Sequence, residues 1–328
     1  MKYSNNEILL MAVGDIYINR EDPNTVFRDI LPLFKNKDIL LGNLETTLID
    51  EILPVALGRT TSLKASQRMI EGIVNANFDL MSLANSHTTD YGPTGLLKTI
   101  EVLDRNKILH TGAGKNLDEA LKPVIIIKNN LKIGFLSYEA TVWSLFAGAK
   151  KGKPGTARVN VNPLLPFPQV AKEDIIKMAQ HIKNVKSTVD VLVISLHCGA
   201  ELTTTLAPHQ KSIAHTAVDS GADIVIGHHP HVIQGIEVYK EKIICYSLGN
   251  FIFDNEIFKN PEDATIIFKA NISPTKMNIS LVPILNDGGN LKLLERSESK
   301  YKEILRKIGE LSQELGTKID ETTGELNI

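Results

Sequence analysis

The chain has 328 residues, a formal net charge of -2, 43% hydrophobic residues and 23% charged residues. These values are ordinary for a globular protein, and the chain is long enough to bury a large core without disulfides. The near-neutral charge excludes nucleic acid as the main expected partner, because a protein that binds nucleic acid needs a basic surplus.

No apolar run approaches the roughly 18 residues needed to cross a bilayer, so we expect no membrane span in this chain. The first apolar run, at 8–13, is too short for the core of an export signal. The chain as given is therefore expected to be cytoplasmic. A chain from which an N-terminal anchor had been removed would look the same, and its location would then be extracellular and membrane-anchored.

Short apolar runs alternate with amphipathic helical patterns, which is typical of an α/β domain. We expect strands at 8–13, 38–41, 78–83, 189–196, 224–226 and 243–247. We expect helices at 25–34, around 69–74, at 92–106 and at 210–220. Two asparagines at 129–130 tolerate a tight hairpin turn, which predicts an antiparallel strand pair at 124–127 and 132–137.

The sequence favours one α/β domain over residues 1–290 and a C-terminal helical extension over 291–328. Within that extension, the helix is expected at about 291–315, followed by a tail at 320–328 that frays. Residues 145–168 are rich in Gly, Pro and Lys, so we expect a loop that covers the sheet.

Polar side chains that suit metal ions follow one predicted strand after another. In an open α/β sheet, ligands bind beyond the carboxyl ends of the strands, so these clusters should meet in one crevice. Their members are Asp15; Asn43 and Glu45; Asn85, His87 and Asp90; His197; and His228, His229 and His231.

Five of the nine histidines fall in these clusters. A mixed set of imidazole and carboxylate groups suits Mn, Zn or Fe, and it could hold one or two divalent metal ions. A pair of ions activates a water molecule and stabilises both the attacking and the leaving oxygen of a displacement.

Each of these residues also has a simpler interpretation when taken alone. Asp15 could cap a helix, and Asn43 and Asn85 could be turn residues. Glu45 could be a solvated charge, and His87 a hydrogen-bonded core histidine. Their joint occurrence at successive strand ends favours the metal site.

Two other groups of residues have competing interpretations. Cys198 and Cys245 each lie beside an apolar run, so two buried free thiols are favoured over a structural disulfide. Cys198 lies next to His197, but neighbouring strand residues point to opposite faces, so a catalytic thiol is not expected. Lys150, Lys151 and Lys153, with Arg158, could form an anion-attracting lid, although a solvated basic loop is the favoured interpretation.

The order of the motifs resembles the CapA/PgsA family of poly-γ-glutamate and capsule synthesis proteins, a branch of the calcineurin-like metallophosphoesterases. The resemblance runs from about residue 8 to residue 254. The matching motifs are Val-Gly-Asp at 13–15, Gly-Asn-Leu-Glu at 42–45, the segments 83–92 and 195–201, and the most specific one, 221–251. This resemblance implies a four-layer α/β/β/α sandwich with mixed parallel and antiparallel sheets.

The resemblance also implies roles for single residues. Asp15, Glu45, Asn85, His197, His228, His229 and His231 resemble metal-site positions. His87 resembles the acid/base histidine of the phosphoesterases, and Asp90 and Glu201 complete the expected catalytic set. Asn43 and Asn250 resemble supporting positions that orient the ligands.

Three functions follow as hypotheses. The first is a CapA-like protein with a metal-dependent site, either a hydrolase or a ligase-associated enzyme, working beside other poly-γ-glutamate synthesis proteins. The second is a phosphoesterase for a small phosphorylated substrate. The third is a non-catalytic component that binds a polyanionic polymer, because Tyr17 and Ser86 replace a histidine and an asparagine of the family motifs. Whether the chain is catalytic stays open from the sequence.

Overall fold

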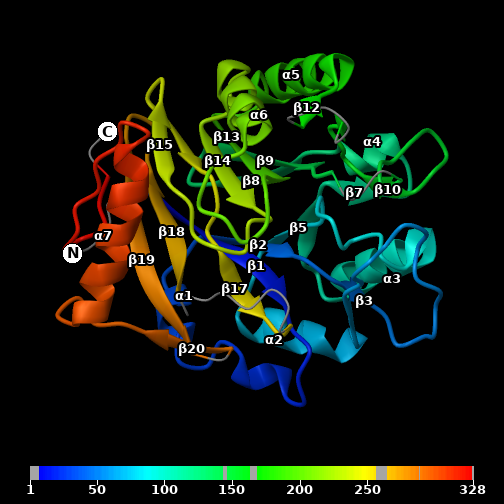
Figure 1. The fold of residues 1–328 in the computed structure, drawn as a ribbon, viewed down its shortest axis with the longest axis horizontal. Helices are drawn as coiled ribbons and strands as arrows, with labels where there is room; N and C mark the ends of the chain where they lie inside the picture. Colours follow the sequence, from blue (N-terminus) through cyan, green and yellow to red (C-terminus); the bar gives the residue numbers. More distant parts are fainter. Residues whose placement is uncertain (1–6, 143–145, 163–167, 256–263, 288, 327–328) are drawn as a thin grey trace.

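The computed structural model describes residues 7–142, 146–162, 168–255, 264–287 and 289–326. Two large mixed sheets form the centre of the molecule (Figure 1). The eight-stranded sheet has the order β20-β19-β18-β1-β2-β5-β6, with β17 pairing with β1. Its strands are β1 (Ile8–Tyr17), β2 (Ile39–Leu44), β5 (Leu80–Ser82), β6 (Leu109–Thr111), β17 (Asn250–Phe253), β18 (Ala264–Ile272), β19 (Met277–Asp287) and β20 (Asn290–Leu293).

The six-stranded sheet has the order β15-β16-β14-β13-β9-β8. Its strands are β8 (Val124–Lys128), β9 (Leu131–Ala140), β13 (Val191–Cys198), β14 (Ile224–His228), β15 (Ile236–Tyr239) and β16 (Lys242–Cys245). Short two-residue strands form three further pairs: β3 (Thr47–Leu48) with β4 (Lys64–Ala65), β7 (Ala113–Gly114) with β10 (Gly155–Thr156), and β11 (Val161–Asn162) with β12 (Gln169–Val170).

The central strands are apolar on both faces because both faces are covered. In β1, Leu9 and Met11 belong to one buried cluster, while Leu10 and Ala12 belong to another. Successive strand residues point to opposite faces, so this alternation places apolar side chains on each side of the sheet. The second cluster also contains Phe135 and other side chains of the six-stranded sheet. The two sheets therefore share one apolar core.

Helices cover the remaining faces (Figure 1). One cluster joins the eight-stranded sheet to α1 (Leu31–Phe34), α2 (Ile70–Asn75) and α3 (Gly92–Arg105). Another joins the six-stranded sheet to α5 (Lys172–Lys186) and α6 (Pro208–Asp219). The short helix α4 (Leu117–Ala120) lies beside β7, and α7 (Ser299–Gln313) contributes Tyr301, Ile304 and Leu305 to the core that the sheets share.

The mixed α/β class, with parallel and antiparallel pairing, is confirmed; the finer four-layer order and the division at residue 290 stay predictions. The predicted hairpin is also present. Its turn residues Asn129 and Asn130 have φ values of 49° and 63°, and β8 pairs antiparallel with β9. Asparagine tolerates this left-handed backbone better than most residues, which explains its position there.

Three expected elements differ in extent. The helix predicted at 25–34 is reduced to α1. Residues before it form tight turns that follow a short 3-10 helix at Pro23–Thr25, and Phe27 and Ile30 are buried in these turns. The C-terminal helix begins at Ser299, since residues 290–293 extend the sheet as β20. The tail does not fray over 320–326: Glu325 bridges to Ser280 and Leu326 to Ile319. Residues 327–328 lie outside the described residues.

The expected loop at 145–168 also contains regular structure. Its described part includes β10 and β11, and Thr156 and Ala157 lie against Gly112 and Ala113 of the neighbouring segment. Residues 145 and 163–167 of this loop lie outside the described residues. The sequence patterns do not single out α5 or the long β18–β19 pair, both of which are present.

Candidate metal centre

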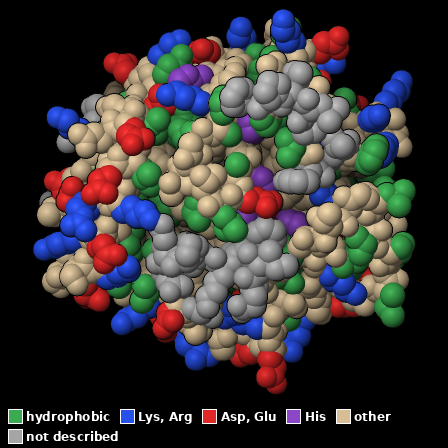
Figure 2. All heavy atoms as spheres, in the orientation of Figure 1, with side chains coloured by type: hydrophobic (Ala, Val, Ile, Leu, Met, Phe, Trp, Pro, Cys, Tyr) green, Lys and Arg blue, Asp and Glu red, His purple; other side chains and the backbone are tan. Residues whose placement is uncertain are grey.

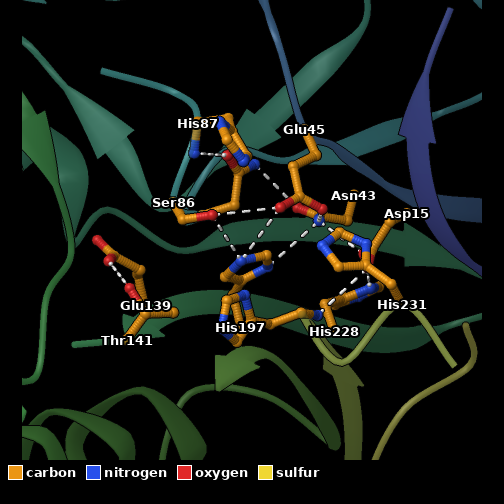
Figure 3. A network of polar contacts seen from close by, with 12 residues as sticks. Asp15, Asn43, Glu45, Ser86, His87, Glu139, Thr141, His197, His228 and His231 are labelled. Atoms are coloured by element: carbon orange, nitrogen blue, oxygen red, sulfur yellow. Dashed lines mark hydrogen bonds and ion pairs between the residues drawn. The ribbon is translucent and has the colours of Figure 1, made fainter. Parts of the chain in front are cut away.

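The strand register brings the predicted ligands to one edge of the two sheets. Asp15 of β1 is the register partner of Asn43 in β2, and His197 of β13 is the register partner of His228 in β14. Glu45 follows β2 directly. All these side chains are fully or almost fully buried, and they point toward one another (Figure 3). The crevice between the two sheets therefore contains a dense group of carboxylates and imidazoles.

Asp15 connects one half of this group. Its Oδ1 accepts a hydrogen bond from Asn43 Nδ2 at 2.8 Å and lies 2.9 Å from His228 Nδ1. Its Oδ2 accepts the backbone N–H of His229 at 3.2 Å and lies 3.7 Å from His231 Nδ1. One carboxylate thus holds the histidine loop that follows β14.

Glu45 connects the other half. Its Oε1 lies 3.4 Å from His197 Nε2, and Ser86 Oγ lies 3.3 Å from each of these two atoms. The rings of His197 and His229 have centroids 4.8 Å apart. Ser86 was not predicted as a site residue, although its place in the 83–92 motif was a usable signal.

Two sets of ligand atoms each lie within 4.8 Å of one another. One set is Glu45, His197 and His229, and the other is Asp15, Glu45 and His231. Glu45 belongs to both sets. The arrangement therefore offers two adjacent sites that share one carboxylate.

The residues present fit a transition-metal ion. His229 Nδ1 and His228 Nε2 are buried, and neither has a hydrogen-bond partner among the described residues. A buried polar atom without a partner costs about 1–3 kcal/mol, so a group that coordinates it is expected. His229 and His231 also have positive φ values, 97° and 61°, a strained backbone that is typical of functional sites. Imidazole and carboxylate ligands suit Mn, Zn or Fe.

Burial tunes the charge of these groups. It lowers the pKa of His197 well below its ordinary value and, with the nearby His231, lowers the pKa of His229 to about 3. Burial and the Asp15 charge raise the pKa of Glu45 well above its usual range. Burial opposes ionisation of Asp15 as well, but the hydrogen bond and charge of His228 hold the Asp15 pKa below its ordinary value. The imidazoles of His197 and His229 are therefore neutral, the form that binds metal.

The predicted asparagines occupy different positions. Asn43 lies inside the group, where its Nδ2 donates to Asp15, and Asn250 Oδ1 lies 2.8 Å from His231 Nδ1. Asn85 instead holds the loop: its Oδ1 accepts the N–H groups of His87 and Thr88, and its Nδ2 donates to Asn43 Oδ1 at 3.0 Å. Both polar atoms of the Asn85 side chain thus bond to its own loop, to Asn43 and to the Leu44 carbonyl.

Two of the predicted catalytic residues, His87 and Glu201, line a small pocket beside the cluster, and the third, Asp90, contacts His87. His87 Nδ1 lies 2.6 Å from Asp90 Oδ2, and Arg59 Nε lies 3.0 Å from Asp90 Oδ1. The pocket has a volume of about 110 Å³, and His87, Ser86 and Glu201 are among its lining residues. Figure 2 shows histidine and acidic side chains in a hollow of this face. Arg59 was not predicted, since an arginine in a loop carries no distinctive sequence signal.

Glu139 is a second residue that the sequence did not reveal. It ends β9 as the register partner of His197, and its carboxylate pairs with the guanidinium of Arg158. Both side chains are buried, at 0% and 3% exposure. Arg158 is therefore a structural partner of Glu139 and not part of a solvated basic loop.

Cys198 and Cys245 are both free and buried, as expected. Burial raises the pKa of each thiol. Cys198 packs in the cluster of the six-stranded sheet with α5 and α6, on the face opposite His197. This position removes the nucleophile interpretation of Cys198.

Comparison with known proteins identifies the family of this chain. The family model described as bacterial capsule synthesis protein PGA_cap matches residues 9–255, which include every side chain of the cluster. The chain belongs to this family. Among the described residues of this PGA_cap protein, no helix is both long and apolar enough to span a membrane.

Three named relatives are similar to this chain. The capsule biosynthesis protein CapA of Bacillus anthracis is 31% identical over 89% of this chain and 71% of its own length. The PGA biosynthesis protein CapA of Bacillus subtilis is 27% identical, over 93% and 79%. A probable polyglutamine synthesis accessory protein of Mycobacterium tuberculosis is 24% identical, over 86% and 74%. Among solved structures, a hypothetical protein from Thermus thermophilus is similar with a TM-score of 0.47 and 13% identity, over 87% of this chain and 96% of that one.

Proposed function

We propose that this PGA_cap protein is a metal-dependent enzyme of capsule or poly-glutamate biosynthesis. It cleaves a bond in an acidic polymer or in the precursor of that polymer, or it transfers a group from one of them. The names of the relatives support the pathway. The reaction class rests on the site. The protein is expected to work with the other proteins of polymer synthesis.

The buried cluster is the observation that carries the proposal. Carboxylates and imidazoles from both sheets converge although each is costly to bury, and the two sets of ligand atoms share Glu45. A structural role alone does not account for the buried ring nitrogens of His228 and His229 that have no partner among the described residues. One or two divalent ions would satisfy them.

In this account Asp15, Glu45, His197, His229 and His231 hold the ions. His228, whose ring Asp15 orients through Nδ1, adds its Nε2 as a further ligand. Bound divalent ions would supply Lewis-acid activation of water and of the reacting bond. Asn43 and Asn250 hold Asp15 and His231 by hydrogen bonds, which keeps the ligands in place before an ion binds.

His87 is the proposed proton donor to the leaving group. It lines the small pocket beside the cluster, and Asp90 fixes the orientation of its ring through Nδ1. The Nε2 edge of that ring then carries the transferred proton. Glu201 lines the same pocket and is placed to hold a substrate group or a water molecule by hydrogen bonding.

A small phosphorylated substrate is the second candidate. The volume of about 110 Å³ beside His87 suits a group the size of a phosphate better than a long side chain. The same ions and the same histidine would serve that reaction. The two candidates differ in substrate and not in the residues that act.

The test is turnover of matched substrates by protein loaded with Mn²⁺ or Zn²⁺. Short γ-linked glutamate oligomers and an aryl phosphate are incubated separately, and products are identified by mass spectrometry. Cleavage or transfer of the oligomer that is lost on chelation and in His87→Gln supports the polymer enzyme. Turnover of the phosphate alone supports the second candidate. Metal-loaded protein that binds the oligomer and converts neither substrate would leave a non-catalytic polymer-binding component.

A further inference from the structure

Three cavities lie in succession beside the metal centre and share lining residues. The smallest, of about 110 Å³, contains Gly58 and Arg59 in its wall, and both also line a cavity of about 350 Å³. Phe146 and Lys153 then line both that cavity and a third one of about 420 Å³, which extends to α5. The shared lining residues place the cavities next to one another, in an order that leads away from His87.

We propose that this path is one binding groove for an extended acidic peptide chain, with its reactive end at the metal centre. The inference rests on the proposed function only for the reaction at that end. The groove itself is argued from charge, apolar surface and the order of the cavities. Its two ends are the His87 pocket and the cavity beside α5.

The charge of the groove favours a carboxylate-rich ligand. Its lining includes Lys150 and Lys153 in the middle. Arg59 near the metal centre and Lys177 at the far end also line it, and they pair with the carboxylates of Asp90 and Glu173. Within the described part of the chain, Lys150 and Lys153 form no ion pair, and Lys153 Nζ donates to the Phe146 carbonyl. A row of cations at spaced positions attracts a polyanion more than it attracts a single anion.

The acidic residues of the lining do not cancel this charge. Asp174 belongs to α5 at the far end of the groove, where its Oδ2 accepts hydrogen bonds from both the backbone and the side chain of Asn160. Glu201 lies at the metal end, beside His87, where the proposed reaction takes place. The middle of the groove therefore stays cationic.

Apolar side chains alternate with the cations. Leu57 is 92% exposed and Phe146 is 75% exposed, and both line the groove. Leu117, Leu121 and Met178 continue the apolar wall in the third cavity. Exposed large apolar side chains beside cations suit a ligand with methylene segments between its carboxylates. A glutamate chain has this composition, whether its peptide bonds are α-linked or γ-linked.

The floor of the third cavity can recognise a polar group. Tyr138 is buried, and its hydroxyl oxygen lies 2.7 Å from His181 Nδ1; burial raises the pKa of the tyrosine and lowers that of the histidine. The tyrosine therefore keeps its proton, and when it donates that proton to Nδ1, the neutral imidazole carries its own proton on Nε2. This N–H is a donor for a carboxylate or a peptide carbonyl in the cavity.

The test compares binding of fluorescent α-linked and γ-linked glutamate oligomers of equal length, by anisotropy, in the metal-loaded full chain. The charge-reversal variant is Lys150→Glu/Lys153→Glu. The matched control is Lys276→Glu/Lys302→Glu, which makes the same change in net charge at exposed positions on the β18–β19 turn and α7. Lys150→Gln/Lys153→Gln serves as a milder variant if the reversal disturbs folding.

We expect the groove reversal to weaken binding by about tenfold or more and the control to change it little. Salt should weaken wild-type binding and have less effect on the variant. Tighter binding of the γ-linked oligomer would assign the groove to that polymer, and equal binding to acidic peptides in general. Equal losses of binding in the variant and the control, or no loss in either, would contradict the proposal that these cavities form one binding groove. If binding follows the prediction but no turnover is ever found, the groove stands and the proposed reaction fails.

Discussion

Glu45 and His197 come from different sheets, and their side chains lie 3.4 Å apart. Glu45 follows β2 of the eight-stranded sheet, whereas His197 belongs to β13 of the six-stranded sheet. An ion bound between them would join the two sheets at the edge of their common core. Metal binding is therefore expected to be coupled to the stability of the whole fold.

Removal of metal should lower the free energy of unfolding. Since an unfolded chain has no preformed site, an ion at about 100 times its dissociation constant adds roughly 2.7 kcal/mol. Urea unfolding with and without chelator measures the difference, and re-addition of Mn²⁺ or Zn²⁺ should restore it. Equal stability of the two forms would mean that the cluster holds no ion that matters to the fold.

Metal binding should release a proton from Glu45. The pKa of Glu45 is raised by burial and by Asp15, so its carboxyl keeps a proton in the metal-free protein to higher pH than usual. Metal requires the carboxylate, so affinity should rise with pH until the pH exceeds that raised pKa. His197 and His229 contribute little, because their lowered pKa values keep them neutral.

Calorimetric titration in buffers of different ionisation enthalpy counts the released protons. The expected count is close to one at pH values below the raised pKa of Glu45. A metal affinity that changes with pH around 6.5, the ordinary pKa of imidazole, would assign the released proton to histidine and contradict this account.

Asp90→Asn should reduce turnover without loss of metal. Asp90 contacts His87 Nδ1 and is absent from both sets of ligand atoms. Loss of the orienting carboxylate is expected to cost about 10–100-fold in kcat, and His87→Gln about 100-fold or more. Metal content and kcat measured on the same samples separate the two effects. If metal were lost along with turnover, Asp90 and His87 would instead be residues that support the metal ligands.

Gly14→Ala should destabilise the fold and the centre. A Cβ at position 14 would lie 1.8 Å from the Gly249 carbonyl oxygen, which accepts the backbone N–H of Asp15. The strand would have to shift, and Asp15 with it, so both stability and metal affinity should fall.

Gly309→Ala is the matched control for this substitution. A Cβ at position 309 in α7 meets no atom within 4 Å. Alanine is the better helix former, so a gain of up to about 1 kcal/mol is expected, with unchanged metal content. If Gly14→Ala changed neither stability nor metal affinity, β1 and β17 would not be tightly packed.

The sequence predicted the centre better than it predicted the edges of the fold. Residues such as His197 and His228 end apolar strands, and parallel strands end at a common edge, so their convergence followed from spacing alone. The helix at 25–34 was wrong because its apolar spacing also fits buried tight turns. The β18–β19 pair was missed because none of the motifs singled out in the sequence lies within these two strands.

Contacts made by side chains from remote loops were beyond the sequence. Arg59 reaches Asp90 from a loop that lacks regular structure, and Arg158 reaches Glu139 from the Gly- and Lys-rich segment. Nothing in either loop's composition distinguishes these arginines from solvated ones. Only the tertiary fold places their charges.

Bound metal per chain tests the central claim most directly. Elemental analysis of protein purified without chelator should give one or two equivalents of Mn, Zn or Fe. His229→Ala/His231→Ala should lose the metal, whereas His110→Ala/His215→Ala, which removes two imidazoles outside both sets of ligand atoms, should keep it. A folded wild type that contains no metal and takes up none on titration would contradict the metal-dependent enzyme.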